Sequence, residues 1–87
     1  MPTTAPLPLI WKQQKEEQAR IRKRENELKK TEKAIEELET RDAQIDEEMS
    51  DPQVATNVAK CVELSREKAE IAEKLEELYE KWEELAQ

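Results

Sequence analysis

The chain has 87 residues, of which 43% are charged and 36% apolar, and its net charge is −7. A chain this short and this charged cannot bury a rounded hydrophobic core. It contains no glycine, which excludes a collagen-like repeat. It has one cysteine and no histidine, which excludes an internal disulfide and a Cys/His metal site. No apolar run approaches the ~20 residues of a membrane-spanning helix. A helical or disordered chain remains, and the abundance of Ala, Glu, Lys, Leu, Arg and Gln favours helix.

Three segments follow one another along the sequence. Residues 1–10 contain three prolines, and because proline fixes φ and lacks an amide donor we expect an extended N-terminal tether or linker there. Residues 11–49 carry one uninterrupted helical pattern. Pro52 interrupts this pattern, so we expect a turn over residues 50–56 and a second helix over residues 57–87.

The sequence leaves two positions open for the beginning of the second helix. Ser50 or Asp51 can cap a helix whose first turn contains Pro52. Thr56 and Asn57 offer a later cap. The second helix is therefore expected to begin between Asp51 and Asn57.

Apolar residues recur at alternating spacings of three and four in both helices. In the first helix they are Ile21, Leu28, Ile35, Leu38, Ile45 and Met49; in the second they are Cys61, Leu64, Ile71, Leu75, Leu78, Trp82 and Leu85. This heptad repeat is typical of a narrow coiled-coil seam. Two such helices joined by a short turn most simply fold back on each other. We therefore predict an all-α fold, a two-helix antiparallel coiled-coil hairpin with an extended N-terminal tether.

Charges beside the seam select one register for the hairpin. In that register three flanking pairs of opposite sign meet, namely Glu48–Lys60, Arg41–Glu67 and Glu27–Lys81. Sliding one helix by a heptad in either direction brings like charges together, which disfavours both shifts. The selected register places Cys61 against Ile45 as a small buried residue. It also places Trp82 opposite Arg24, where a cation–π contact would be favourable, whereas Trp11 lies outside the repeat and is either an anchor for the tether or an exposed residue with no role.

Basic and acidic residues are segregated along the chain. Residues 1–35 hold nine basic and five acidic side chains, and residues 36–87 hold six basic and seventeen acidic ones. Seven of the nine basic residues occupy the outward heptad positions of the first helix; this basic ridge consists of Lys12, Lys15, Arg22, Lys23, Lys29, Lys30 and Lys33. Such a ridge suits phosphate backbones, because neutralising phosphates releases condensed counterions. The alternative is that the ridge is only a solvated coiled-coil surface.

The sequence contains no recognisable set of catalytic residues. It has no histidine, no glycine-rich phosphate loop and no nucleophile beside a base. Carboxylates on a solvated helix face have no cleft that would shift their pKa values for acid–base catalysis. We therefore expect that this segment is not an enzyme and uses no cofactor of its own.

The sequence LYEKWEEL at residues 78–85 resembles the closing signature of the C-terminal coiled-coil domain of ABC-F ATPases. The resemblance includes the basic stretch KQQKEEQARIRKRENELKK, the segment IEELE and the SDP turn, and it covers nearly the whole chain after residue 11. In that family two ATP-binding domains precede a linker and a two-helix hairpin. The Walker motifs and the ABC signature are absent from this sequence, so ATP and Mg²⁺ are implied only for a parent protein.

The resemblance implies a cytoplasmic hairpin that contacts nucleic acid, which is DNA in some members and ribosomal RNA in others. Members act on translating ribosomes, and some confer antibiotic resistance. The positions that match the family's basic stretch, together with the last ridge residue, are Lys12, Lys15, Arg20, Arg22, Lys23, Arg24, Lys29, Lys30 and Lys33.

The resemblance also leaves the organisation of the protein open. The chain is expected to be a monomer, either an excised domain or a free-standing relative, and its own ATPase domains are a second expected partner. No membrane partner is expected. The alternative function is a purely structural protein–protein module, either a homodimer or a spacer that docks on the ATPase domains.

Overall fold

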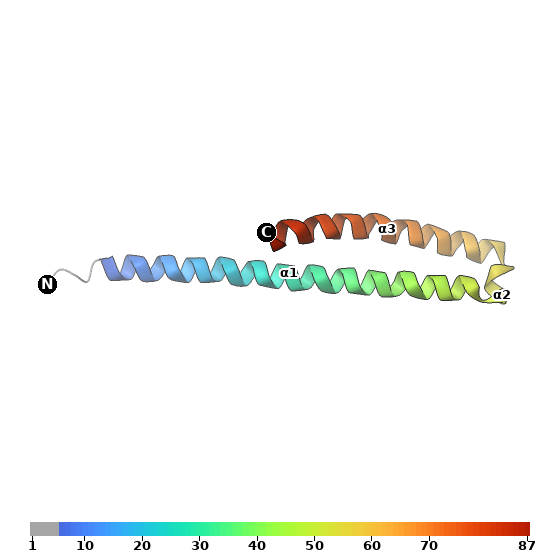
Figure 1. Ribbon diagram of the computed structural model, residues 1–87, viewed down its shortest axis with the longest axis horizontal. Helices are drawn as coiled ribbons and strands as arrows, with labels where there is room; N and C mark the ends of the chain where they lie inside the picture. Colours follow the sequence, from blue (N-terminus) through green and yellow to red (C-terminus); the bar gives the residue numbers. More distant parts are fainter. Residues whose placement is uncertain (1–5) are drawn as a thin grey trace.

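The computed structural model describes residues 6–87, with side chains from Leu9 onward. These residues form three helices, α1 (Pro6–Ser50), α2 (Pro52–Ala55) and α3 (Val58–Ala86). The helix α3 runs back antiparallel along α1, and α2 closes one end (Figure 1). The result is a rod of 84 × 17 × 16 Å. The predicted all-α antiparallel hairpin is confirmed.

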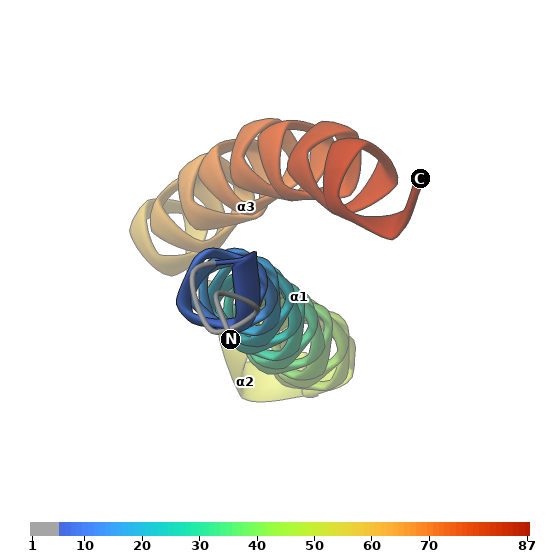
Figure 2. The same cartoon turned by 90° about the vertical axis from the view of Figure 1, so that its left-hand side faces the viewer.

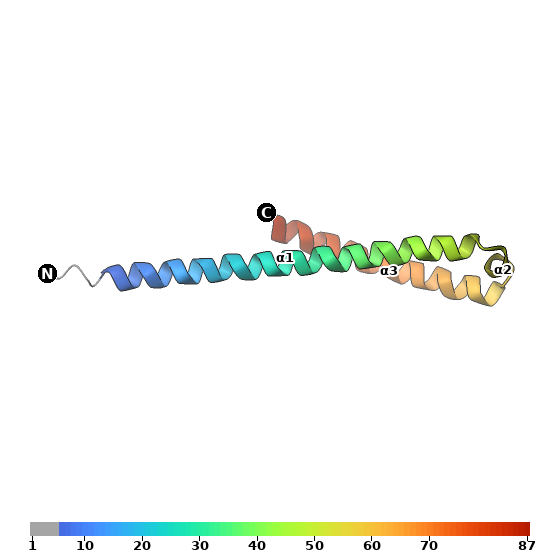
Figure 3. The same ribbon diagram turned by 90° about the horizontal axis from the view of Figure 1, so that it is seen from below.

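The two long helices cross each other obliquely. Seen from below, α3 lies on one side of α1 near α2 and on the other side near its own C-terminus (Figure 3). The end-on view shows the same crossing (Figure 2). This winding keeps a heptad seam facing the partner helix along its length.

The N-terminus of α1 differs from the predicted tether. Residues 6–10 are helical, because α1 begins at Pro6. Pro6 and Pro8 lie in the first turn, where backbone amides have no intrahelical partner, so a proline there removes no hydrogen bond. The remainder of the predicted tether, residues 1–5, lies outside the described residues.

The turn uses both of the candidate helix starts. The Asp51 carboxylate accepts a hydrogen bond of 2.9 Å from the backbone N–H of Gln53 and caps α2. The Asn57 side chain accepts one of 3.1 Å from the backbone N–H of Lys60 and caps α3. Each cap satisfies an amide that would otherwise have no partner. The predicted turn therefore contains the four-residue helix α2, and the long second helix begins at Val58.

The core lies where the heptad repeat places it. Ile45, Leu64 and Ile71 are buried together, and Leu38, Met49, Val54 and Leu75 pack against them. Thr31 is only 2% exposed, and its hydroxyl donates to the backbone carbonyl of Glu27 at 2.8 Å. This bond removes the penalty of burying an unpaired hydroxyl.

Cys61 is half-buried on this seam. The prediction treated Cys61 as a small buried residue against Ile45. Cys61 is less buried than predicted, and its thiol contacts the turn, with Sγ 3.2 Å from the backbone carbonyl oxygen of Val54. The thiol therefore joins α3 to α2, as a weak donor.

Two cross-helix ion pairs confirm the predicted register. Arg41 donates two hydrogen bonds to the Glu67 carboxylate, at 2.6 and 2.8 Å. Lys81 lies 3.3 Å from Glu27 near the other end of α3. A slide of one heptad would separate the partners of each pair by about 10 Å along the helix axis, so both pairs select the same register.

The third predicted pair, Glu48–Lys60, is not among the ion pairs of the described residues. The Glu48 carboxylate lies 3.7 Å from Arg41, one heptad earlier on its own helix. Arg41 thus holds one carboxylate from each helix. A guanidinium has five donors in a planar fork, which allows this double contact.

The open end of the hairpin departs from the predicted contacts. Trp82 does not stack on Arg24; its indole N–H donates to the Glu32 carboxylate at 3.3 Å. Arg24 instead donates through Nε to the backbone carbonyl of Leu85 at 2.7 Å. The last carbonyls of a helix have no intrahelical partner and carry partial negative charge, which attracts a cation. Ile21 is left 50% exposed at this end.

Protonating Glu67 is expected to weaken the hairpin at low pH. The hydrogen bonds from Arg41 lower the pKa of Glu67 below its ordinary 4.5. Since the folded pKa is the lower one, the stabilisation is complete above pH 4.5 and is lost as pH falls through the folded pKa. Urea unfolding from pH 7 to about pH 2 should show the stability gap between the chain and its Glu67→Gln variant closing. A gap that stays constant would contradict the ion pair.

Candidate nucleic-acid interface

The N-terminal part of α1 is a single helix within the described part of the chain. The helix α1 has 45 residues and α3 has 29, and α1 projects well beyond the C-terminal end of α3 (Figure 1). Every residue from 9 to 26 is exposed, and the first half-buried residues are Glu27 and Leu28. The seam therefore ends near these residues.

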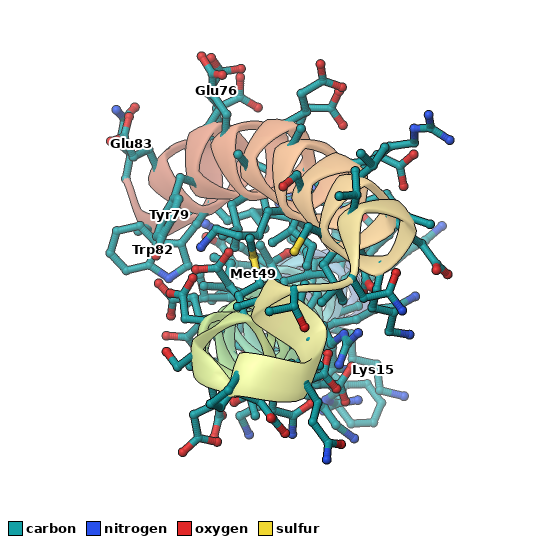
Figure 4. All side chains as sticks on the ribbon, turned by 90° about the vertical axis from the view of Figure 1, so that its right-hand side faces the viewer. Lys15, Met49, Glu76, Tyr79, Trp82 and Glu83 are labelled. Atoms are coloured by element: carbon teal, nitrogen blue, oxygen red, sulfur yellow. The ribbon has the colours of Figure 1, made fainter. Side chains whose placement is uncertain are left out.

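The basic ridge runs along the outer side of α1. All seven of its residues are exposed. At 100° per residue they fall within a sector of about 120° that faces away from the seam, and they span about 32 Å along the axis. In the view along the rod, Lys15 lies on the side opposite to Tyr79 and Trp82 (Figure 4). The predicted ridge is thus a continuous exposed surface.

Most cations of the ridge have no fixed intramolecular partner. No ion pair within 4.0 Å among the described residues involves Lys12, Arg22, Lys23, Lys29, Lys30 or Lys33. Three cations beside the seam, Arg41, Lys68 and Lys81, form ion pairs. The structure thus separates cations that hold the hairpin together from cations that face solvent.

Three of the predicted site residues contact other residues of the chain. Lys15 Nζ lies 4.9 Å from the ring centroid of Trp11. Arg20 lies 3.9 Å from Glu17, but both side chains are about 70% exposed, so this pair contributes little. Arg24 is held by the last turn of α3. Arg24 therefore has a structural contact that the other predicted residues lack.

Among the described residues, the groups with shifted pKa values all belong to the hairpin contacts. The pKa of Glu67 is lowered and that of Arg41 is raised because the two side chains hydrogen-bond each other. The pKa of Lys68 is raised by its hydrogen bonds to Asp46 and Asp42. The pKa of Tyr79 is raised because its hydroxyl donates to Glu39. Shifted pKa values often mark catalytic sites. Here each one has a structural cause away from the ridge.

The described residues offer neither a metal site nor a membrane-spanning segment. No three acidic or cysteine side chains among them come together as metal ligands. None of the three helices combines the length and the apolar character that crossing a bilayer requires. What the ridge can do is bind a polyanion through charge.

The sequence analysis did not predict that Trp11 lies on the same helix face as Lys15 and contacts it. Its ring packs under Lys15, four residues later on the same helix, and it is 65% exposed. The signal was present, because residues four apart lie on the same helix face. The predicted tether obscured it, since an extended chain would have ended just before Trp11.

Comparison with known families gives one match. The profile of the ABC transporter C-terminal domain family matches residues 20–87. Comparison with curated proteins and with solved structures gives no significant match. The family match covers the two-helix part of the hairpin and five of the seven ridge residues.

Proposed function

Because this chain belongs to the ABC transporter C-terminal domain family, we propose that it is a non-catalytic accessory hairpin of a cytoplasmic ABC-F ATPase that contacts nucleic acid, either DNA or ribosomal RNA. The contact surface is the basic ridge of α1. The observation that carries the proposal is a row of exposed cations without fixed intramolecular partners. Such cations can exchange water and counterions for phosphates at little structural cost.

The charge distribution orients the rod on its partner. Residues 36–87 carry eleven more acidic than basic side chains, and these residues include the turn and all of α3. This part of the rod is repelled by phosphates, whereas the N-terminal two-thirds of α1 is attracted. The proposed complex therefore has the ridge against the nucleic acid and α3 facing away from it.

The dimensions of the rod limit how it can approach a duplex. The rod measures 17 × 16 Å across its long axis, and two helices packed side by side are wider than the ~12 Å major groove of B-DNA. A single helix with side chains is about 10–12 Å wide. The single-helix part of α1 can therefore enter a groove, while Lys29, Lys30 and Lys33 in the two-helix part contact the backbone from outside the groove.

Binding to nucleic acid is expected to fall steeply with salt. If four to seven ridge cations neutralise phosphates, log Kd should change with log salt with a slope of about 4–6, which is ~10²–10⁴-fold weaker binding at 200 mM than at 50 mM salt. Fluorescence anisotropy with labelled DNA duplex and with a ribosomal RNA fragment measures this slope. Affinity that does not respond to salt, or no binding at 50 mM, would reject the proposal.

A structural protein–protein role is the second candidate function. It is favoured by Ile10 and Ile21, which continue the line of the seam beyond α3 and are 49% and 50% exposed. A second copy, or the ATPase domains of a parent protein, could cover them. We expect a monomer in sedimentation at several concentrations; reversible dimerisation would favour this second function.

A further inference from the structure

Trp11 is the most exposed aromatic side chain among the described residues. It is 65% exposed, compared with 43% for Tyr79 and 36% for Trp82. Tyr79 and Trp82 both donate hydrogen bonds across the hairpin, to Glu39 and Glu32. The packing of the hairpin explains those two aromatics but leaves Trp11 without a role.

The position of Trp11 aligns it with the basic ridge. Lys15, Arg22 and Lys29 follow it at intervals of 4, 11 and 18 residues. On a helix with 3.6 residues per turn, all three lie within about 40° of Trp11 around the axis. The ammonium of Lys15 lies 4.9 Å from the centre of the indole ring. The indole is thus the N-terminal end of a row of cations.

The neighbouring apolar residues do not form a common surface with Trp11. Leu9 and Ile10 are 60% and 49% exposed, but successive helical residues point about 100° apart. Ile10 lies on the line of the seam, whereas Trp11 lies on the line of the ridge. A partner helix that covered the seam would therefore leave Trp11 uncovered.

We propose that Trp11 stacks on an unpaired base and that Lys15 and Arg22 bind the adjacent phosphates, so that the N-terminal part of α1 recognises single-stranded segments of nucleic acid. This inference rests on the proposed function and adds the class of strand that is bound. An aromatic ring beside a line of cations is the combination by which proteins hold single strands. An unpaired base is available for stacking, whereas a base in a duplex must first be unstacked.

The experiment uses the fluorescence of Trp11 in the full chain. The Trp82→Phe variant retains Trp11 as its single indole. We expect a single-stranded oligonucleotide to quench this fluorescence at 50 mM salt, and a duplex of equal length to bind with little quenching. Replacing Trp11 by alanine should weaken single-strand binding about tenfold and leave duplex binding within about twofold. Trp11→Tyr should restore most of the loss, because tyrosine also stacks.

A matched control and the remaining outcomes separate this inference from the proposed function. Leu9→Ala removes a similarly exposed apolar side chain off the line of the ridge and should leave both affinities unchanged. If the single strand and the duplex both bind without quenching, and Trp11→Ala has no effect on binding, the stacking role is overturned but the proposed function stands. If neither the single strand nor the duplex binds, both the stacking role and the proposed function are overturned. A fluorescence change that follows protein concentration alone would identify Trp11 as a contact between copies and overturn the inference.

Discussion

Replacing Ile45 by alanine is expected to lower the free energy of unfolding by about 2–5 kcal/mol. Ile45 is completely buried and packs with Leu64 and Ile71 in the part of the seam near the turn. A single core in a chain this small supplies only about 3–5 kcal/mol of net stability. The variant should therefore be largely unfolded at 25 °C. Urea unfolding followed by far-UV circular dichroism measures this loss.

The matched control is the same substitution at Ile21. Ile21 has the same side chain on the same helix and also belongs to the apolar heptad repeat, but it is 50% exposed. Its replacement by alanine should change stability by no more than about 0.5 kcal/mol. Equal losses at Ile45 and Ile21 would contradict a seam that carries its stability near the turn. Ile45→Val, expected to cost about 0.5–1.5 kcal/mol, gives a graded intermediate that still folds.

The hairpin itself was predictable because its determinants are periodic or local. The heptad repeat identified the buried residues, and Ile35, Ile45, Leu64 and Ile71 are indeed the buried apolar ones. A proline within a helical pattern marks a break, whatever the rest of the chain does. The charged residues beside the seam then selected one register, because like-charge contacts penalise the alternatives.

The individual polar contacts were less predictable, as the interaction of Lys68 shows. Lys68 and Asp42 occupy seam positions that the heptad repeat would fill with apolar residues, seven residues after Cys61 and Ile35. In the structure Lys68 reaches Asp46 at 2.6 Å and Asp42 at 3.2 Å. A long flexible side chain selects its partner from several within reach, and heptad position alone does not decide among them. The same freedom explains why Arg41 reaches Glu48.

The candidate interface was predictable as a surface and less so residue by residue. All nine predicted residues are exposed on α1. Six of them lie where no partner helix covers α1, and the heptad positions of Lys29, Lys30 and Lys33 face away from the seam. Arg24 was the exception in its contacts, since the end of α3 offers it a carbonyl. Where α3 ends relative to α1 depends on the tertiary register and on the shape of the turn. A sequence pattern gives that position only approximately.

Reversing the charge of four ridge residues, by Arg22→Glu, Lys23→Glu, Lys29→Glu and Lys30→Glu together, is expected to abolish nucleic-acid binding. Each substitution removes one phosphate contact and adds a repulsive charge. None of the four has an ion-pair partner in the hairpin, so the fold should survive. At 50 mM salt we expect affinity to fall by at least about a hundredfold. Anisotropy titration measures the loss, and circular dichroism verifies the helix content.

A control with equal charge separates the ridge from the net charge of the protein. Arg22→Glu with Lys29→Glu changes the net charge by the same amount as Arg66→Glu with Lys74→Glu, and all four residues are exposed. Arg66 and Lys74 lie on α3, which is expected to face away from the phosphates. If long-range charge alone controlled binding, the two double variants would lose affinity equally. We expect the ridge variant to lose most of its affinity and the α3 variant to lose little; equal losses would show that no defined ridge contacts the nucleic acid.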